Sequence, residues 1–193
     1  MKKLIGSKKI KTVVFISGRG SNLKNLINFS NKKNSPILIN LVISNKKAKG
    51  LSFAKKNKIE RKIINFSNSK KAEKNILNLL NKKKIKFICL AGFMKILSSN
   101  FVRKFNGKII NIHPSLLPKY KGLNTHEKAI KNNEKISGCT VHYVTSKLDS
   151  GKIIMQKKVK IRKNDSVKTL EKRILKEEYL LYPKAIKKIL PRI

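Results

Sequence analysis

Acidic side chains are scarce in this sequence: its 193 residues hold 9 Asp and Glu against 48 Lys and Arg, a formal net charge of +39. An excess of this size ordinarily indicates a nucleic acid or an anionic membrane as the partner. The lysines, however, are spread over almost every expected loop and exposed helix face, and Ile and Asn are abundant with them, as A/T-rich codons would produce. We therefore favour compositional bias, and expect nonspecific, salt-sensitive binding to polyanions rather than a specific nucleic-acid partner.

Long apolar runs and closely spaced cysteines are also missing. No stretch approaches the roughly 18 consecutive apolar residues of a membrane span, and residues 2–9 lack the apolar centre of a secretion signal. The two cysteines, Cys89 and Cys139, lie far apart without metal-ligand spacing. We expect a cytoplasmic protein without a membrane partner, whose cysteines are reduced core thiols.

The first half of the chain alternates between strand and helix patterns. The apolar, β-branched run Val13–Ser17 predicts a strand, and after Gly18-Arg19-Gly20 the residues Leu23, Leu26 and Ile27 recur at helical spacing. Further expected strands are 37–44, 63–64, 87–91 and 109–110, and further expected helices are 51–58 and 72–80. This alternation predicts a Rossmann-like three-layer α/β fold, with a mainly parallel central sheet and helices on both faces.

The pattern changes in the second half. Pro114–Gly122 is rich in loop-forming residues and is followed by an expected helix at 125–132 and strands at 139–144 and 153–161. Asp165-Ser166 predicts the cap of a last amphipathic helix that ends at Leu181, before Pro183. A chain of this length suits one core, so we expect a single domain at 12–193 behind a basic, disordered extension at 1–11.

A glycine-containing loop, Ser17–Asn22, stands where the first strand feeds the first helix. The backbone N–H groups and helix dipole at such a point can bind an anion such as phosphate. The loop does not match a dinucleotide-binding site, because Leu23 occupies the third glycine position and no acid ends the second strand, and it lacks the Gly-Lys-Ser/Thr of a P-loop. A small phosphorylated substrate fits better. The alternative is a tight turn in which Ser21 or Asn22 caps the helix.

Asn111, His113 and Asp149 carry side chains suited to acyl transfer. An Asn amide can donate to a developing oxyanion, a His can exchange a proton near neutral pH, and an Asp can orient or charge that His. Asn111 and His113 follow an apolar strand, at the edge where open α/β sheets bind ligands. Asp149 alone could equally be a turn residue, and for His126 and His142 we expect structural roles.

Several segments resemble the phosphoribosylglycinamide formyltransferase family, the folate-dependent enzymes of purine synthesis. The resemblance extends from Thr12 to Pro183 and is carried by residues 16–23, 90–97, 111–120, 138–144 and 148–151. The Asn/His/Asp set is shared by folate formyltransferases and formyl hydrolases generally. The Gly-Ser-Asn loop and the sequence Leu-Pro-Lys-Tyr-Lys-Gly-Leu-Asn-Thr-His narrow the resemblance to this family.

The resemblance implies transfer of the formyl group of 10-formyltetrahydrofolate to the amine of glycinamide ribonucleotide, without a metal. The phosphate would be bound by Gly20, Ser21 and Asn22, and the ribose or glycinamide by Glu178. Folate-binding residues would be Lys70, Met94, Lys95, Ile96, Leu97 and Asn111, together with the loop 144–149. Asn111 and His113 would flank the formyl carbon, and Asp149 would keep His113 charged.

The sequence departs from the family pattern at three positions. Lys95 stands where the family usually has Arg or another residue, and Asn124 stands where it usually has His. Lys70 is matched to a basic family residue in a poorly aligned stretch, and a Lys lacks the bidentate geometry of an Arg.

Two related enzymes and one unrelated class remain as alternatives. Methionyl-tRNA formyltransferases add a C-terminal tRNA-binding domain, and formyltetrahydrofolate hydrolases an N-terminal regulatory domain, for neither of which we expect room here. A basic nucleic-acid-binding module on the same scaffold would explain the charge, but would leave the glycine loop and the Asn/His/Asp set without a purpose. We expect a monomer or a homodimer.

Overall fold

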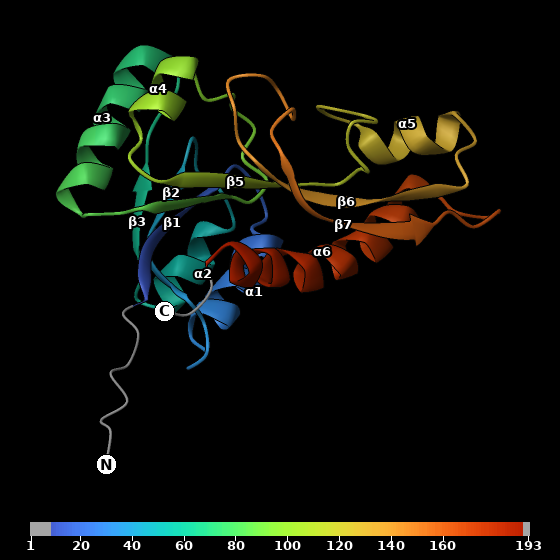
Figure 1. Cartoon of the computed structure of the whole chain (residues 1–193), viewed down its shortest axis with the longest axis horizontal. Coiled ribbons are helices and arrows are strands. Elements are labelled where there is room, and N and C mark those ends of the chain that lie inside the picture. Colours follow the sequence, from blue (N-terminus) through green and yellow to red (C-terminus); the bar gives the residue numbers. More distant parts are fainter. Residues whose placement is uncertain (1–8, 191–193) are drawn as a thin grey trace.

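A seven-stranded sheet runs through the middle of the computed structural model, which describes residues 9–190 (Figure 1). The strands are β1 (Ile10–Ile16), β2 (Ile37–Ser44), β3 (Glu60–Ile63), β4 (Phe87–Leu90), β5 (Lys108–His113), β6 (Ile136–Tyr143) and β7 (Ile153–Lys160). The helices are α1 (Ser21–Ser30), α2 (Leu51–Lys56), α3 (Ser69–Lys82), α4 (Ser99–Lys104), α5 (Thr125–Lys131) and α6 (Val167–Ile189).

The sheet is mainly parallel, as the sequence predicts. Its strand order is β3-β2-β1-β4-β5-β6-β7, and the pairs from β3 to β5 are parallel, whereas β6 and β7 are antiparallel to their neighbours. The carboxyl ends of β1, β4 and β5 therefore meet at one edge. From β1 the chain continues outward to β2 and β3 on one side, and from β4 it continues to β5 on the other. The place between β1 and β4 is therefore a topological switch point, where open α/β sheets bind ligands.

Helices cover both faces of the sheet, so the three-layer α/β class is confirmed. Alternate residues of β1 enter two different cores: Val14 and Ile16 pack with α1, α2 and α6, and Val13 and Phe15 pack with α3 and α4. Figure 1 shows these helix groups on opposite sides of the sheet. Both cysteines are buried as free thiols, and burial raises the pKa of each.

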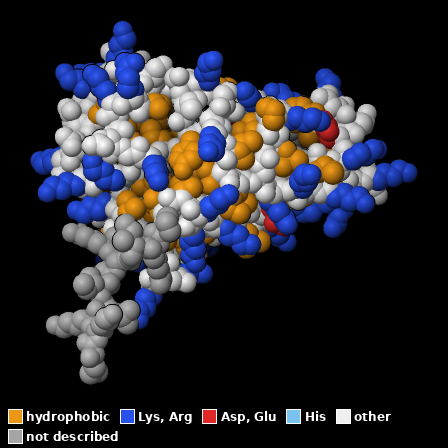
Figure 2. All heavy atoms as spheres, in the orientation of Figure 1, with side chains coloured by type: hydrophobic (Ala, Val, Ile, Leu, Met, Phe, Trp, Pro, Cys, Tyr) orange, Lys and Arg blue, Asp and Glu red, His pale blue; other side chains and the backbone are white. Residues whose placement is uncertain are grey.

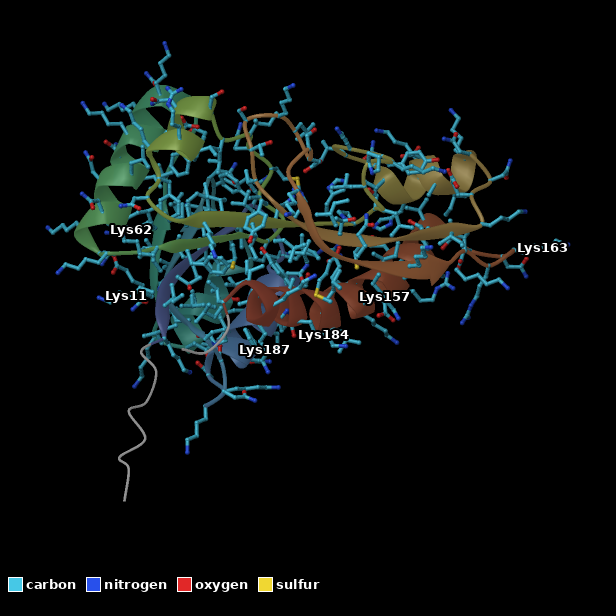
Figure 3. The ribbon with its side chains drawn as sticks, in the orientation of Figure 1. Lys11, Lys62, Lys157, Lys163, Lys184 and Lys187 are labelled. Carbon is cyan, nitrogen blue, oxygen red and sulfur yellow. The ribbon has the colours of Figure 1, made fainter. Side chains whose placement is uncertain are left out.

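Lysines are distributed over the molecule rather than gathered into one patch. Figure 2 shows Lys and Arg side chains on all parts of the visible face. The lysines labelled in Figure 3 come from β1, β3, β7, α6 and the loop after β7, and lie from one end of the molecule to the other. This dispersion agrees with compositional bias, since a nucleic-acid site concentrates its charge on one face.

The last helix is longer than the sequence predicts. We expected it to end at Leu181, but α6 continues through Pro183 to Ile189. A proline cannot donate to the carbonyl four residues earlier, here that of Tyr179. The Asn25 side-chain amide donates to this Tyr179 oxygen at 2.9 Å. This bond replaces the missing one, and core packing on both sides of the proline keeps the helix continuous.

The structure differs from the sequence prediction in two smaller ways. Helix α4 was not expected. The Ser98 hydroxyl caps this helix by accepting from the Phe101 N–H, and the buried carboxylate of Glu73 accepts from Ser98. Strand β1 begins at Ile10, inside the extension expected at 1–11, of which residues 1–8 lie outside the described part. Between residues 9 and 190, no helix is both long and apolar enough to cross a membrane.

Candidate active site

The turn after β1 depends on glycine. Gly20 has a left-handed backbone (φ 76°), and a Cβ placed on it would lie 2.6 Å from the Gly50 Cα. Gly20 is also the N-cap of α1, without a side-chain cap. The alternative in which Ser21 or Asn22 caps the helix is therefore wrong. The N–H groups at the start of α1 remain available to an anion.

Asn22 connects the glycine loop to α6. Its side-chain amide donates to the Glu178 carboxylate at 2.6 Å, whereas its own Oδ1 is buried without a partner. Burial raises the pKa of Glu178 to about 7, with the Asn22 bond opposing this shift and the neighbouring Glu171 adding to it. A buried acceptor without a donor is costly, so this pair is suited to a ligand that supplies donors.

The Asn/His/Asp set converges where β5 ends. Asn111 and His113 lie at the C-terminal end of strand β5, and the loop after β6 brings Asp149 to both. His113 Nδ1 lies 3.4 Å from Asp149 Oδ2, and Asn111 Nδ2 lies 3.5 Å from Asp149 Oδ1. The side chains of His113 and Asp149 are only 6% and 8% exposed, so water screens the interaction between them only weakly.

His142 is a fourth member of this cluster that the sequence analysis missed. It pairs with Asn111 across β5 and β6, and its Nε2 lies 3.3 Å from Asn111 Nδ2 and 3.5 Å from Asp149 Oδ1. The structural role expected for His142 stays a prediction, but its position brings it beside two residues of the Asn/His/Asp set. The available signal was the alternation of β6, where Cys139 and Val141 face the core and His142 faces the other side.

Opposing effects act on the two titrating groups at the centre. Burial lowers the pKa of His113, and the Tyr120 carbonyl and the Asp149 charge raise it without restoring its ordinary value. Burial raises the pKa of Asp149, but hydrogen bonds from His142 and the Gly122 N–H, and the nearby His113, bring it below its ordinary value. Asp149 is therefore an ionised carboxylate, and charging His113 is harder than the sequence analysis assumed.

A cavity of about 760 Å³ joins the glycine loop to the Asn/His/Asp cluster. The predicted site residues on its wall are Ser21, Asn22, Met94, Lys95, Ile96, Asn111, His113, Asp149 and Glu178. Exposed apolar side chains also surround it, namely Met94, Ile96, Leu123, Leu148 and Val167. This combination suits a ligand with a flat apolar ring system and polar groups.

The wall formed by Met94–Ile96 is held by Ser17. The Ser17 hydroxyl accepts from the Met94 N–H at 2.8 Å and donates to Asn45 Oδ1 at 2.6 Å. Ser17 thus ties the end of β1 to the loop after β4.

Three predicted site residues do not line this cavity. Gly20 packs against the backbone of Gly50. Leu97 is 3% exposed and packs in the core with α3 and α4. Lys70 lines a separate groove of about 820 Å³ between α3 and α4, away from the Asn/His/Asp cluster. In residues 9–190, no group of three or more His, Cys, Asp or Glu side chains is arranged to hold a metal ion.

Comparisons with known proteins agree with this geometry. The formyl transferase family matches residues 10–186. The chain is 44% identical over 181 residues to a phosphoribosylglycinamide formyltransferase of Haemophilus influenzae, covering 92% of this chain and 85% of that protein. It is 43% identical over 183 residues to the human trifunctional purine biosynthetic protein adenosine-3, covering 93% of this chain but only 18% of that protein.

A solved structure is similar over nearly its whole length. The phosphoribosylglycinamide formyltransferase of Brucella melitensis superposes with a TM-score of 0.90 at 40% identity, covering 96% of this chain and 98% of that chain. The family resemblance read from the motifs is thus confirmed: the chain belongs to the formyl transferase family, among the phosphoribosylglycinamide formyltransferases.

Proposed function

We propose that this chain transfers the formyl group of 10-formyltetrahydrofolate to the amine of glycinamide ribonucleotide by direct attack. The observation that carries the proposal is the convergence of Asn111, His113 and Asp149 in a cavity that the first residues of α1 also line. The family membership supports the same reaction.

In this proposal the glycine loop and Glu178 bind the ribonucleotide. The free N–H groups at the start of α1, with the Ser21 side chain, receive the phosphate. The Asn22–Glu178 pair receives hydroxyl or amine donors of the substrate, which would satisfy the buried Asn22 Oδ1. The exposed apolar side chains Met94 and Ile96 cover the pterin ring of the folate.

The chemical step joins the substrate nitrogen to the formyl carbon and breaks the bond from that carbon to N10. The Asn111 amide donates to the tetrahedral oxyanion, and is available because its present contacts, at 3.3 and 3.5 Å, are long. His113, when protonated, adds positive charge beside this oxyanion. The ionised Asp149 lowers the cost of charging His113 and accepts the amine proton through water, and N10 regains a proton as it leaves.

The test is substrate turnover by the purified protein. It should convert glycinamide ribonucleotide and 10-formyltetrahydrofolate to the formylated ribonucleotide and tetrahydrofolate, followed by folate absorbance and by detection of the formylated product. Omitting the ribonucleotide is the control. Equal release of tetrahydrofolate without the amine would indicate a formyl hydrolase instead.

A further inference from the structure

Tyr120 lines a second cavity, distinct from the active-site cavity. The second cavity, of about 630 Å³, is lined by residues that include Tyr120, Asn132 and Glu134. Tyr120 has a left-handed backbone (φ 55°), a conformation that is unfavourable for a residue with a Cβ and that must be held by its surroundings.

On the inner side, the backbone around Tyr120 contacts two members of the catalytic cluster. The Tyr120 carbonyl accepts a hydrogen bond from His113 Nε2 at 2.9 Å. Two residues later, the Gly122 N–H donates to Asp149 Oδ2 at 2.9 Å. A shift of the segment 120–122 would therefore move a partner of His113 and a partner of Asp149 together.

On the outer side, the Tyr120 side chain is anchored to the turn between α5 and β6. Its hydroxyl donates to Glu134 Oε1 at 2.8 Å and accepts from Asn132 Nδ2 at 2.9 Å. Lys119 Nζ donates to the same Glu134 oxygen at 2.8 Å. The four residues that make these bonds line the second cavity and not the active-site cavity.

We propose that Tyr120 is a positioning residue for the formyl transfer, with Glu134 as its anchor. Its hydroxyl fixes the segment whose backbone orients His113 and Asp149. The kinetic part of this inference rests on the proposed function, but its effect on His113 does not. The loss should be partial, because the Ser115 hydroxyl also holds this segment by donating to the Lys119 carbonyl at 2.6 Å.

The test compares substitutions that keep or remove the Tyr120–Glu134 bond. Tyr120→Phe and Glu134→Ala remove it. Glu134→Gln keeps an oxygen acceptor for the hydroxyl, and Lys119→Met removes only the ion pair, so these two are matched controls. Thermal melting of each variant checks that it is folded.

The first readout is the pKa of His113, measured by NMR titration without substrate. The other titrating groups that act on this ring are Asp149, His142 and His126, and none is altered. Loosening the Tyr120 carbonyl removes a bond that favours the charged imidazole, so the pKa of His113 should fall in Tyr120→Phe and Glu134→Ala. It should stay at the wild-type value in the two controls.

The second readout is steady-state kinetics. In Tyr120→Phe and Glu134→Ala, kcat should fall by about tenfold, since misplaced catalytic groups cost rate, and KM for either substrate should change less than about twofold. A folded Tyr120→Phe protein with an unchanged His113 pKa would overturn the positioning role, as would an equal pKa shift in Lys119→Met. If the pKa shifts but no variant, including the wild type, forms formylated ribonucleotide, the proposed function fails and the positioning role remains.

Discussion

Glu178 should make the protein less stable as the pH rises. Its carboxyl group is 6% exposed, and burial raises its pKa from 4.5 to about 7. The folded state then binds a proton more tightly than the unfolded state, so stability is fully present below pH 4.5 and is lost as the pH rises through 7. A shift of this size corresponds to about 3 kcal/mol.

Glu178→Gln removes this titration. The Gln oxygen can still accept from the Asn22 amide, which now donates to Glu178 at 2.6 Å, and the new amide can supply a donor to the unpartnered Asn22 Oδ1. We expect the wild-type and Glu178→Gln proteins to have similar free energies of unfolding near pH 4.5. Above pH 7 the variant should be more stable by up to about 3 kcal/mol.

The assay is urea unfolding at a series of pH values from 4.5 to 8.5, followed by circular dichroism. The decisive quantity is the difference in the free energy of unfolding between the two proteins at each pH, which cancels all other titrating groups. A difference that stays constant across this range would refute the raised pKa. The same variant should also have a higher KM for the ribonucleotide, because the Gln side chain offers one acceptor oxygen to the substrate's donors where the Glu178 carboxylate offers two.

Three further predictions concern the cluster, the glycine turn and the surface. Asp149→Asn should lower kcat and shift its pH profile toward acid, because the Asp149 charge raises the pKa of His113 and its loss lowers that pKa. Asn111→Ala should lower kcat by about 10² without moving the profile. A wild-type profile in Asp149→Asn would mean that Asp149 is only a turn residue. Gly20→Ala should lower the free energy of unfolding by at least about 1 kcal/mol, because Gly20 has a positive φ and lies close to Gly50. Gly18→Ala is the control, since a Cβ at Gly18 meets nothing within 4 Å; equal melting temperatures for the two variants would contradict this. Binding to RNA or DNA should be independent of sequence and weaken steeply as salt is raised from 50 to 200 mM, and sequence-selective binding at the higher salt would revive a nucleic-acid role.

Local sequence pattern was sufficient for the α/β class and for much of the site. Continuous apolar runs such as Val13–Ser17 predict buried parallel strands because both of their faces must be covered. Asn111 and His113 could be placed at the ligand-binding edge because they follow such a run, and the glycine turn could be placed there for the same reason. Their association with Asp149, by contrast, came from the family resemblance, because a lone Asp two residues before a Gly is an ordinary turn residue.

Tertiary contacts decided the rest, since they join residues far apart in the chain. The pairing of β5 with β6 places His142 beside Asn111, and strand register cannot be read from one strand alone. Helix α6 passes Pro183 because Asn25, from a different helix, supplies the missing donor. The packing of α3 and α4 buries Leu97 and turns Lys70 toward another groove. The sequence by itself determined which elements form and which chemical groups stand at their ends, and only the tertiary structure decided which of these groups meet, because burial and hydrogen bonding between distant segments set their positions.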